Sequence, residues 1–233
     1  MMISSDVKKS TWIVIAALNE AKRVGSVVRG LRKRGYVHVV VVDDGSTDAT
    51  SAIARKAGAR VVRHVINRGQ GASLQTGMEF ALEHGAKYIV HFDADGQHDA
   101  DELHVLLNPL VGKKYDVTLG SRFLKRTSDI PLKRRIMLKI AILVNFALYG
   151  IKMTDAHNGY RAFTRSAAQK VRITADDAEH ASEIVELVKR HGLRYIEVPV
   201  TIRYSDELIA KGTTSFSKSV RTGLRLVIRK FFH

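Results

Sequence analysis

The chain has 233 residues, a length typical of one substantial α/β domain. Hydrophobic residues make up 45% and charged residues 26%, which excludes a disordered chain. The 38 Lys and Arg residues outnumber the 23 Asp and Glu residues, and the net charge of +15 predicts a polyanionic partner: nucleic acid, a phosphate-bearing substrate or an anionic membrane surface. The lack of Cys excludes disulfides, thiolate catalysis and Cys-ligated metal sites, and fits a reducing compartment.

We expect neither a secretory signal nor a membrane-spanning segment in this sequence. Residues 1–11 are polar and have no apolar h-region. The longest charge-free apolar stretch lies between Lys139 and Lys152, and its 12 residues fall short of the roughly 20 that a spanning helix needs. We therefore expect the chain to lie on a membrane at most.

Strand and helix signals alternate over the first two-thirds of the chain. Short apolar runs predict strands at Trp12–Ala17, His38–Val42, Arg60–His64, Tyr88–Phe92 and Val117–Leu119. Helical spacing predicts helices at Asn19–Arg34, Thr47–Ala57, Gly71–His84 and Ala100–Leu110. Further along we expect a helix at 140–149, a loop at 154–161, a helix near Glu179–His191 and a strand near Tyr195–Val198. The pattern predicts one α/β domain, residues 1–210, whose mostly parallel sheet is flanked by helices on both faces.

Polar clusters follow three of the predicted strands. Asn19-Glu20 follows the first, Asp43-Asp44-Gly45-Ser46 the second, and the run from Asp93 to His98 the fourth. Ligands of open parallel sheets bind at the carboxyl ends of the strands, so we expect these clusters to share one site.

Asp93 and Asp95 are spaced to reach one hard cation, Mg²⁺ or Mn²⁺, with Gln97 as a neutral oxygen ligand. An Asp-Gly turn, with Asp99 capping the next helix, would explain the same acids without a metal. The register with the other clusters favours the metal site.

Two other segments suit a nucleotide. Asp43 and Asp44 are candidates to accept hydrogen bonds from its base or ribose, although a turn and a helix N-terminus favour the same residues. The run from Asn67 to Gly71 precedes a helix whose N-terminus would attract phosphate, with glycine allowing close approach. This run matches neither G-x-G-x-x-G nor a P-loop and is weak alone.

Taken together, the residues resemble the family 2 glycosyltransferases of GT-A, Rossmann-like fold. The matching motifs are Ala-Leu-Asn-Glu (17–20), Asp-Asp-Gly-Ser-Thr-Asp (43–48), Asn-x-Gly-x-Gly (67–71), Asp-Ala-Asp-Gly-Gln-His (93–98), Gly-Ser-Arg (120–122) and Asp-x-x-x-Gly-Tyr-Arg (155–161). The resemblance covers residues 12 to about 204. One departure is Ala16, where the family usually has Pro, and it removes no chemical group.

Within that family the chain is most similar to polyprenyl-phosphate sugar transferases of the dolichol-phosphate mannose synthase type. The resemblance implies an inverting enzyme that moves a sugar from a nucleotide-diphosphate sugar to a polyprenyl phosphate, with Mg²⁺ or Mn²⁺ as cofactor. It implies that the metal ligands are Asp95 and Gln97, with Asp93 near the ribose or in the outer shell. The donor-binding residues that it implies are Ala16, Asn19, Glu20, Asp43, Asp44, Asn67, Gly71, Asp93, Ala94 and Asp95.

Three further residues take catalytic roles by resemblance. Arg122 would stabilise the leaving diphosphate, and Asp155 matches the position of a proposed general base. Arg161 would bind a phosphate. Alternatively, Asp155 orders its loop and Arg161 forms a salt bridge to it. Glu183 is a more speculative candidate, since a carboxylate on a helix surface needs no function.

Most of the positive charge lies in two segments. Residues 122–139 carry seven Lys or Arg and one acid, residues 211–233 carry six and none, and together they supply 12 of the 15 charges. Lys133, Arg134 and Arg135 precede the apolar stretch, so we expect them to bind the acceptor phosphate or lipid headgroups. A core helix with a basic flank is the alternative for this segment.

Residues 211–233 are predicted to form a basic amphipathic helix, which would either bind an anionic bilayer or pack on the sheet. These features predict a cytoplasmic protein that is peripheral on the cytoplasmic membrane face.

Two other functions fit parts of the sequence. A soluble family 2 enzyme acting on a saccharide or protein hydroxyl would have the same motifs up to Asp95. A nucleic-acid-binding protein would explain the charge, but no nucleic-acid-binding motif is present, aromatic residues make up only 7%, and the clustered acids would repel a phosphate backbone. We therefore expect no nucleic-acid partner.

Overall fold

A mixed sheet forms the centre of the structure, a computed structural model that describes residues 3–124, 135–136, 138–140, 142–143, 146, 150–155 and 158–203. Its strands are β1 (Thr11–Ala17), β2 (His38–Asp43), β3 (Arg60–Arg63), β4 (Tyr88–His91), β5 (Val117–Ser121), β6 (Arg161–Thr164) and β7 (Tyr195–Pro199). They lie in the order β3-β2-β1-β4-β6-β5-β7. Only β6 runs antiparallel to its neighbours β4 and β5 among these described strands, so the predicted mostly parallel sheet is confirmed.

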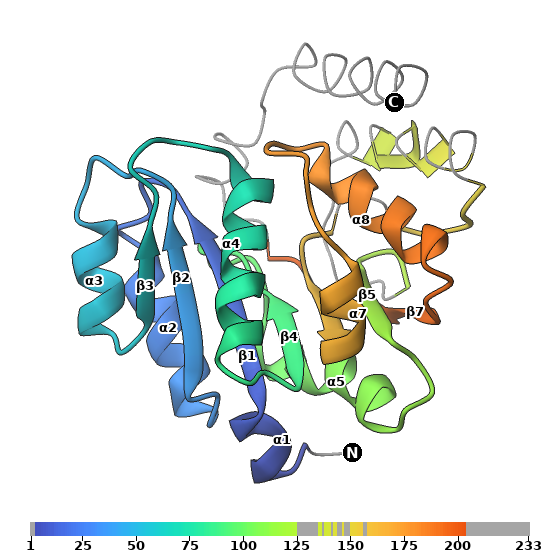
Figure 1. Cartoon of the computed structure of the whole chain (residues 1–233), viewed down its shortest axis with the longest axis horizontal. Coiled ribbons are helices and arrows are strands. Elements are labelled where there is room, and N and C mark those ends of the chain that lie inside the picture. The colour runs from blue at the N-terminus through green and yellow to red at the C-terminus, as the bar shows by residue number, and fades with distance from the viewer. Residues whose placement is uncertain are drawn as a thin grey trace.

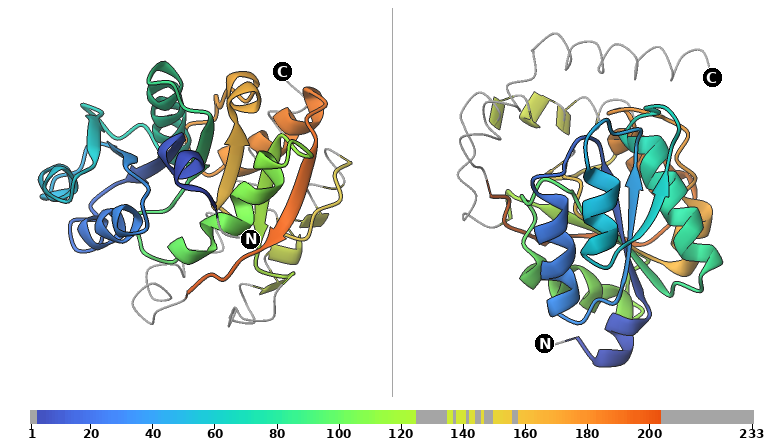
Figure 2. Two further views of the ribbon diagram at one scale, coloured as in Figure 1. Left: turned by 90° about the horizontal axis from the view of Figure 1, so that it is seen from below. Right: turned by 90° about the vertical axis from the view of Figure 1, so that its left-hand side faces the viewer.

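Helices cover both faces of this sheet (Figures 1 and 2). They are α1 (Ser5–Lys9), α2 (Val24–Lys33), α3 (Thr50–Lys56), α4 (Gln70–Glu83), the 3₁₀ helix η1 (Ala100–Glu102), α5 (Leu103–Val111), α7 (Arg165–Lys170) and α8 (His180–Arg190). One hydrophobic layer packs α2, α3 and α5 on the sheet, and the other packs α4, α7 and α8.

The central strands are mostly apolar because they are buried on both faces. In β1, Ile13 and Ile15 face the first layer, whereas Trp12 and Val14 face the second. Side chains alternate along a strand, so a strand between two helical layers needs apolar residues at every position.

Strand β6 corrects the prediction that the loop from residue 154 ends at Arg161. Its four residues, Arg-Ala-Phe-Thr, give no alternating pattern, and their strand geometry depends on pairing with β4 and β5. Helices α1 and α7 are also absent from the prediction. The Thr164 hydroxyl accepts from the N–H of Ala167 at 3.3 Å, a capping signal that would have revealed α7.

Helices α2 and α3 begin later than predicted, at Val24 rather than Asn19 and at Thr50 rather than Thr47. The preceding loops bond to each other instead. Asn19 Oδ1 accepts from the N–H of Thr47 at 2.9 Å, and the N–H of Ala21 donates to Asp48 Oδ2 at 3.2 Å. These contacts fix two loops at the carboxyl edge of the sheet.

Some predictions lie wholly or partly outside the described residues. Lys133, Arg134 and residues 211–233 are outside, so the C-terminal helix and the domain boundary remain predictions. Of the helix predicted at 140–149, residues 140, 142–143 and 146 are described and helical. In the described part of the chain, no helix is both long and apolar enough to cross a membrane.

Candidate active site

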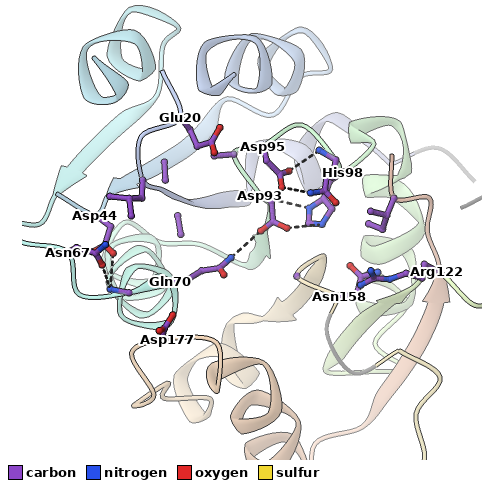
Figure 3. Close-up of a pocket in the computed structure, with 18 residues that line it drawn as sticks. Glu20, Asp44, Asn67, Gln70, Asp93, Asp95, His98, Arg122, Asn158 and Asp177 are labelled. Carbon is purple, nitrogen blue, oxygen red and sulfur yellow. Dashed lines mark hydrogen bonds and ion pairs between the residues drawn. The ribbon is translucent and has the colours of Figure 1, made fainter. Parts of the chain in front are cut away.

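A cavity of about 410 Å³ opens beyond the carboxyl ends of β1, β2 and β4 (Figure 3). Nine residues predicted from the sequence line it: Ala16, Glu20, Asp44, Asn67, Asp93, Ala94, Asp95, Gln97 and Arg122. The polar clusters that follow three separate strands therefore meet in one site. Asn19, Asp43, Gly71, Asp155 and Arg161 are predicted site residues that are not among its lining residues.

Asp93 and Asp95 lie in the middle of the cavity. Burial raises the pKa of Asp93 to about 6, against the opposing charges of Arg161 and Arg122. Burial, followed by the charge of Asp93, also raises the pKa of Asp95. The cavity therefore holds two carboxylates that are short of compensating positive charge.

Gln97 orients one of these acids. Its backbone N–H donates to Asp95 Oδ1 at 2.9 Å, and its side-chain Nε2 donates to Asp95 Oδ2 at 2.6 Å. The side-chain amide thus presents nitrogen, not oxygen, to Asp95 in this structure.

His98 holds the other acid in place. The N–H of Asp93 donates to His98 Nδ1 at 3.1 Å, so the ring proton is on Nε2, which lies 3.2 Å from Asp93 Oδ2. Burial lowers the pKa of His98 to about 4, in keeping with a neutral ring. The ring stacks on Tyr160 at 4.5 Å between centroids, which fixes its plane.

Asp44 lines the cavity, but its carboxylate already has several donors. Oδ1 accepts from the N–H of Arg68 at 2.9 Å and lies 2.7 Å from His64 Nδ1, and Oδ2 accepts from the N–H of Gly69 at 2.8 Å. Asp44 therefore holds the loop that carries Asn67.

Asp43 points away from the cavity into the fold. It is fully buried and accepts hydrogen bonds from the N–H of Ser46 and the hydroxyl of Ser51. Burial opposes ionisation, but these hydrogen bonds lower the pKa of Asp43 overall. Its carboxylate stabilises the loop after β2.

Two backbone N–H groups in the first turn of α4 are already bonded within the fold, and the donor-binding role of Gly71 stays a prediction. The carbonyl oxygen of Asp176 accepts from the N–H of Gly71 at 2.7 Å and from the N–H of Ala72 at 3.3 Å. A Cβ at Gly71 would lie 1.9 Å from the carbonyl oxygen of Ala175. Glycine is therefore needed at this position for the close packing of two backbones.

Arg122 and Asp155 form a buried ion pair at the end of the cavity away from Asn67 (Figure 3). Arg122 Nε donates to Asp155 Oδ2 at 2.6 Å, and the Arg122 N–H donates to the same oxygen at 3.1 Å. Asp155 Oδ1 is buried and has no hydrogen-bond partner among the described residues. Arg122 lines the cavity, so Asp155 fixes the cation that faces the ligand.

Arg161 begins β6 and is buried beneath the site. Its Nε donates to the carbonyl oxygen of Asn158 at 3.0 Å, and Nη2 donates to that of Ala181 at 3.1 Å. Burial lowers the pKa of Arg161 to about 10, against the charges of Asp155 and Asp93. This guanidinium therefore acts on the cavity through its charge and through the loop that it braces.

Glu183 is buried in α8, which corrects the expectation of a carboxylate on a helix surface. It accepts from the N–H of Thr174 at 3.1 Å and from the N–H of Ala175 at 2.8 Å, so it fixes the loop at residues 174–177. Asp177, carried by this loop, lines the cavity.

Several lining residues lie outside the predicted set. They include Leu18, Gly69, Gln70, His98, Asn158, Asp177 and Ile202. His98 and Asn158 fall inside the quoted motifs, but Asp177 and Ile202 lie far from them in sequence. No local pattern marks those two residues.

The oxygen atoms of the cavity fit part of a divalent-cation site. Mg²⁺ is usually held by one or two carboxylates, with waters and substrate phosphates completing its coordination. Asp93 and Asp95 supply such a pair, and a cation would relieve their repulsion. Within the described residues, no three His, Cys, Asp or Glu side chains are grouped to hold a metal by themselves.

The sequence model for "Glycosyl transferase family 2" matches residues 12–172. This chain is a family 2 glycosyltransferase. The matched range includes the cavity residues from Ala16 to Gly159 and both acids of the Asp93–Asp95 pair.

The glycosyltransferase is similar to proteins of known and unknown activity. It is 37% identical over 229 residues to an uncharacterised protein of Methanocaldococcus jannaschii, covering 97% of this chain and 94% of the relative. It is 30% identical to the UDP-N-acetylglucosamine–dolichyl-phosphate N-acetylglucosaminyltransferase of Methanococcus voltae, covering 88% and 90%. It is also 30% identical to the polyprenol monophosphomannose synthase of Mycolicibacterium smegmatis, covering 82% and 76%.

Solved structures show the same fold. The glucosyl-3-phosphoglycerate synthase of Mycobacterium tuberculosis matches with a TM-score of 0.71 and 18% identity, covering 97% of the glycosyltransferase and 82% of that chain. A structure of the same enzyme with Mn²⁺, UDP-glucose and phosphoglyceric acid also matches with a TM-score of 0.71, at 17% identity, covering 97% and 81%. The predicted GT-A fold is confirmed.

Proposed function

We propose that this glycosyltransferase moves a sugar, with inversion, from a nucleotide-diphosphate sugar to a polyprenyl phosphate at a membrane surface. The donor assignment is supported by the cavity, which combines an acid pair with a buried cation in the manner needed to bind a metal-complexed diphosphate. The acceptor assignment is supported by two relatives at 30% identity whose names specify dolichyl phosphate and polyprenol.

One structural feature of this chain supports the assignment of a lipid acceptor. Ile136, Ile140, Leu143 and Phe146 are 44–66% exposed and recur at helical spacing, so they form an apolar stripe on one helical face. Arg135 and Lys139 are exposed on the same helical segment. Apolar side chains with flanking cations suit the interface of an anionic bilayer. We call these four apolar residues the 136–146 stripe.

In the proposed complex, Asp93 and Asp95 hold Mg²⁺ or Mn²⁺, and Gln97 keeps Asp95 oriented. When bound there, the ion supplies positive charge to the donor diphosphate. Arg122 faces the cavity and stabilises the negative charge that grows on the leaving group. Asp155 keeps that guanidinium in position. The positive charge of Arg161, which is buried beneath the site, also stabilises the negative charge on the leaving group.

The transfer step needs no proton when the acceptor is a phosphate. A phosphate monoester has its second pKa near ~6, so its oxygen is already anionic at neutral pH. That oxygen bonds to the anomeric carbon, the bond from this carbon to the diphosphate breaks, and the electron pair leaves with the nucleoside diphosphate. A sugar hydroxyl would instead need a general base, and Asp155 is partly occupied by Arg122.

A transfer assay distinguishes the acceptor classes. The full chain is incubated with radiolabelled nucleotide sugars, Mn²⁺ or Mg²⁺, and either a short polyprenyl phosphate in detergent or saccharide acceptors. We expect label in the organic phase, dependent on the lipid phosphate. Label appearing only in saccharide or protein products would support the hydroxyl-acceptor alternative and overturn the lipid assignment.

A further inference from the structure

Val65 and Ile66 are the most exposed large apolar side chains in the described part of the chain, at 97% and 68%. They connect β3 to α4 and directly precede Asn67, which lines the cavity. Two adjacent β-branched side chains in this loop leave apolar surface in contact with water at the rim of the site. Exposed apolar surface of this kind indicates a binding partner.

The loop that carries this pair is ordered by the fold. Asp44 accepts from the backbone N–H groups of Arg68 and Gly69, as described above. On the other side, Gly45 packs so closely that a Cβ there would lie 2.9 Å from the backbone of Ile66 and Asn67. Val65 and Ile66 therefore stand on a fixed backbone, with their side chains presented to the outside.

Cationic residues flank the pair along the chain. Residues 49–78 contain five Lys or Arg and no Asp or Glu. Arg63 and Arg68 lie two residues from the pair on either side, and both are exposed. Apolar side chains in such a surrounding are complementary to an anionic lipid surface.

This loop lies at the same end of the molecule as the 136–146 stripe. The connection from β3 to α4 and the described helical residues of 135–146 both lie beyond the carboxyl ends of the parallel strands (Figures 1 and 2). The cavity lies at this end too, and Asn67 and Arg122 mark its opposite ends (Figure 3). By contrast, Val37, which is 43% exposed, precedes β2 at the opposite edge of the sheet.

We propose that Val65 and Ile66 form a second membrane contact, which enters the interfacial layer of an anionic bilayer at the same end of the fold as the 136–146 stripe. Two separate contacts fix the orientation of the protein on the bilayer better than one contact does. They would hold the mouth of the cavity against the lipid headgroups, where the acceptor phosphate lies. A bilayer is the partner that fits both contacts at once, because both are apolar, flanked by cations and placed at one end of the fold. This inference rests on the proposed function for its first contact and for its acceptor.

The lack of Cys allows a direct test with single-cysteine variants of the full chain. Ile66→Cys, Ile140→Cys and Val37→Cys are labelled with a polarity-sensitive fluorophore and mixed with vesicles of phosphatidylcholine, with and without phosphatidylglycerol. We expect a blue shift and quenching by lipid-borne quenchers for the labels at positions 66 and 140, stronger with the anionic lipid. The label at position 37 should stay in water.

Each other outcome overturns a defined statement. Insertion at position 140 without insertion at position 66 overturns the second contact and leaves the proposed function intact. Insertion at neither position overturns both membrane contacts. Equal responses at positions 66 and 37 also overturn the inference, because they show adsorption without orientation.

A second measurement avoids the label. Val65→Ser together with Ile66→Ser should weaken binding to anionic vesicles by about tenfold, since two apolar side chains no longer leave water. Transfer to a short polyprenyl phosphate in detergent, where no bilayer must be engaged, should be retained. Val37→Ser is the matched control and should bind vesicles as the wild type does. Unchanged vesicle binding by the double variant contradicts the proposal.

Discussion

The guanidinium of Arg122 is held by the buried carboxylate of Asp155, with 2.6 Å between Nε and Oδ2. Asp155→Ala would leave a buried guanidinium without this carboxylate, so we expect the free energy of unfolding to fall by about 3–5 kcal/mol. Asp155→Asn retains the shape but removes the charge, and we expect it to lower kcat about 100-fold through misplacement of Arg122. Urea denaturation and initial rates measure the two effects.

A matched control for this pair is available at the surface. Asp116 bonds Arg194, whose side chain is 59% exposed, so Asp116→Ala should cost under about 1 kcal/mol. Equal losses for Asp155→Ala and Asp116→Ala would show that burial adds nothing to the Arg122–Asp155 pair.

Asp95→Asn tests the proposed metal site. It removes one of two carboxylates that repel each other, so the metal-free protein should keep its melting temperature. The rise in melting temperature on adding Mn²⁺ with a nucleoside diphosphate should disappear, since a ligand stabilises only what it binds. We expect activity to fall at least about 100-fold. Asp101→Asn, at a side chain 67% exposed, is the control. Mn²⁺-stimulated transfer at the wild-type rate by Asp95→Asn would refute the assignment.

The parts of the site that were predictable from sequence are those set by local pattern. Continuous apolar runs marked the buried strands, and parallel strands bring their carboxyl ends to one edge, so the meeting of Asp44, Asp93 and Asp95 followed. Helix starts were less predictable, because the loop groups of Asn19 and Asp48 bond across to each other and not within their own helices.

The remaining features depend on contacts between distant parts of the chain. Strand β6 is a strand because β4 and β5 flank it. Gly71 fits a ligand-binding loop by sequence, yet its close partner is Ala175, more than 100 residues away. Asp177 reaches the cavity only because Glu183 and the N-terminus of α4 hold its loop. No local spacing encodes these relationships.

Gly71→Ala should destabilise the protein because the added methyl group would meet the carbonyl of Ala175. Backbone atoms at 1.9 Å must move, and we expect a loss of about 1–3 kcal/mol in the free energy of unfolding. A Cβ at Gly112 would meet nothing nearer than 3.5 Å, so Gly112→Ala should be within about 0.5 kcal/mol of wild type. Equal stability of the two variants would argue against the close packing of α4 on the loop at residues 174–177.

Asp177→Asn should weaken donor binding. The Asp44 carboxylate already accepts hydrogen bonds from the loop at residues 68–69. The Asp177 carboxylate faces the same cavity and makes no hydrogen bond or ion pair with another residue in the described part of the chain. A free carboxylate at this place can accept a hydrogen bond from an N–H or hydroxyl group of the nucleotide sugar. Loss of that hydrogen bond should raise the KM for the nucleotide sugar about tenfold, with a smaller change in kcat. Asp176→Asn, one residue away and outside the cavity lining, should leave KM unchanged. A kcat effect without a KM effect would exclude a role in donor binding.

Asp43 should contribute stability that depends on pH. Its hydrogen bonds from Ser46 and Ser51 lower its pKa in the folded state below the unfolded value near ~4. Stability from this group is therefore fully present above the unfolded pKa and is lost as the pH falls through the folded pKa. Asp43→Asn can accept fewer of these bonds, so it should be less stable than wild type by about 1–3 kcal/mol at pH 7. Denaturant unfolding between pH 7 and pH 3 should show this difference shrinking below about pH 4. A difference that stays constant over the whole range would mean that the ionised carboxylate of Asp43 does not stabilise the loop after β2.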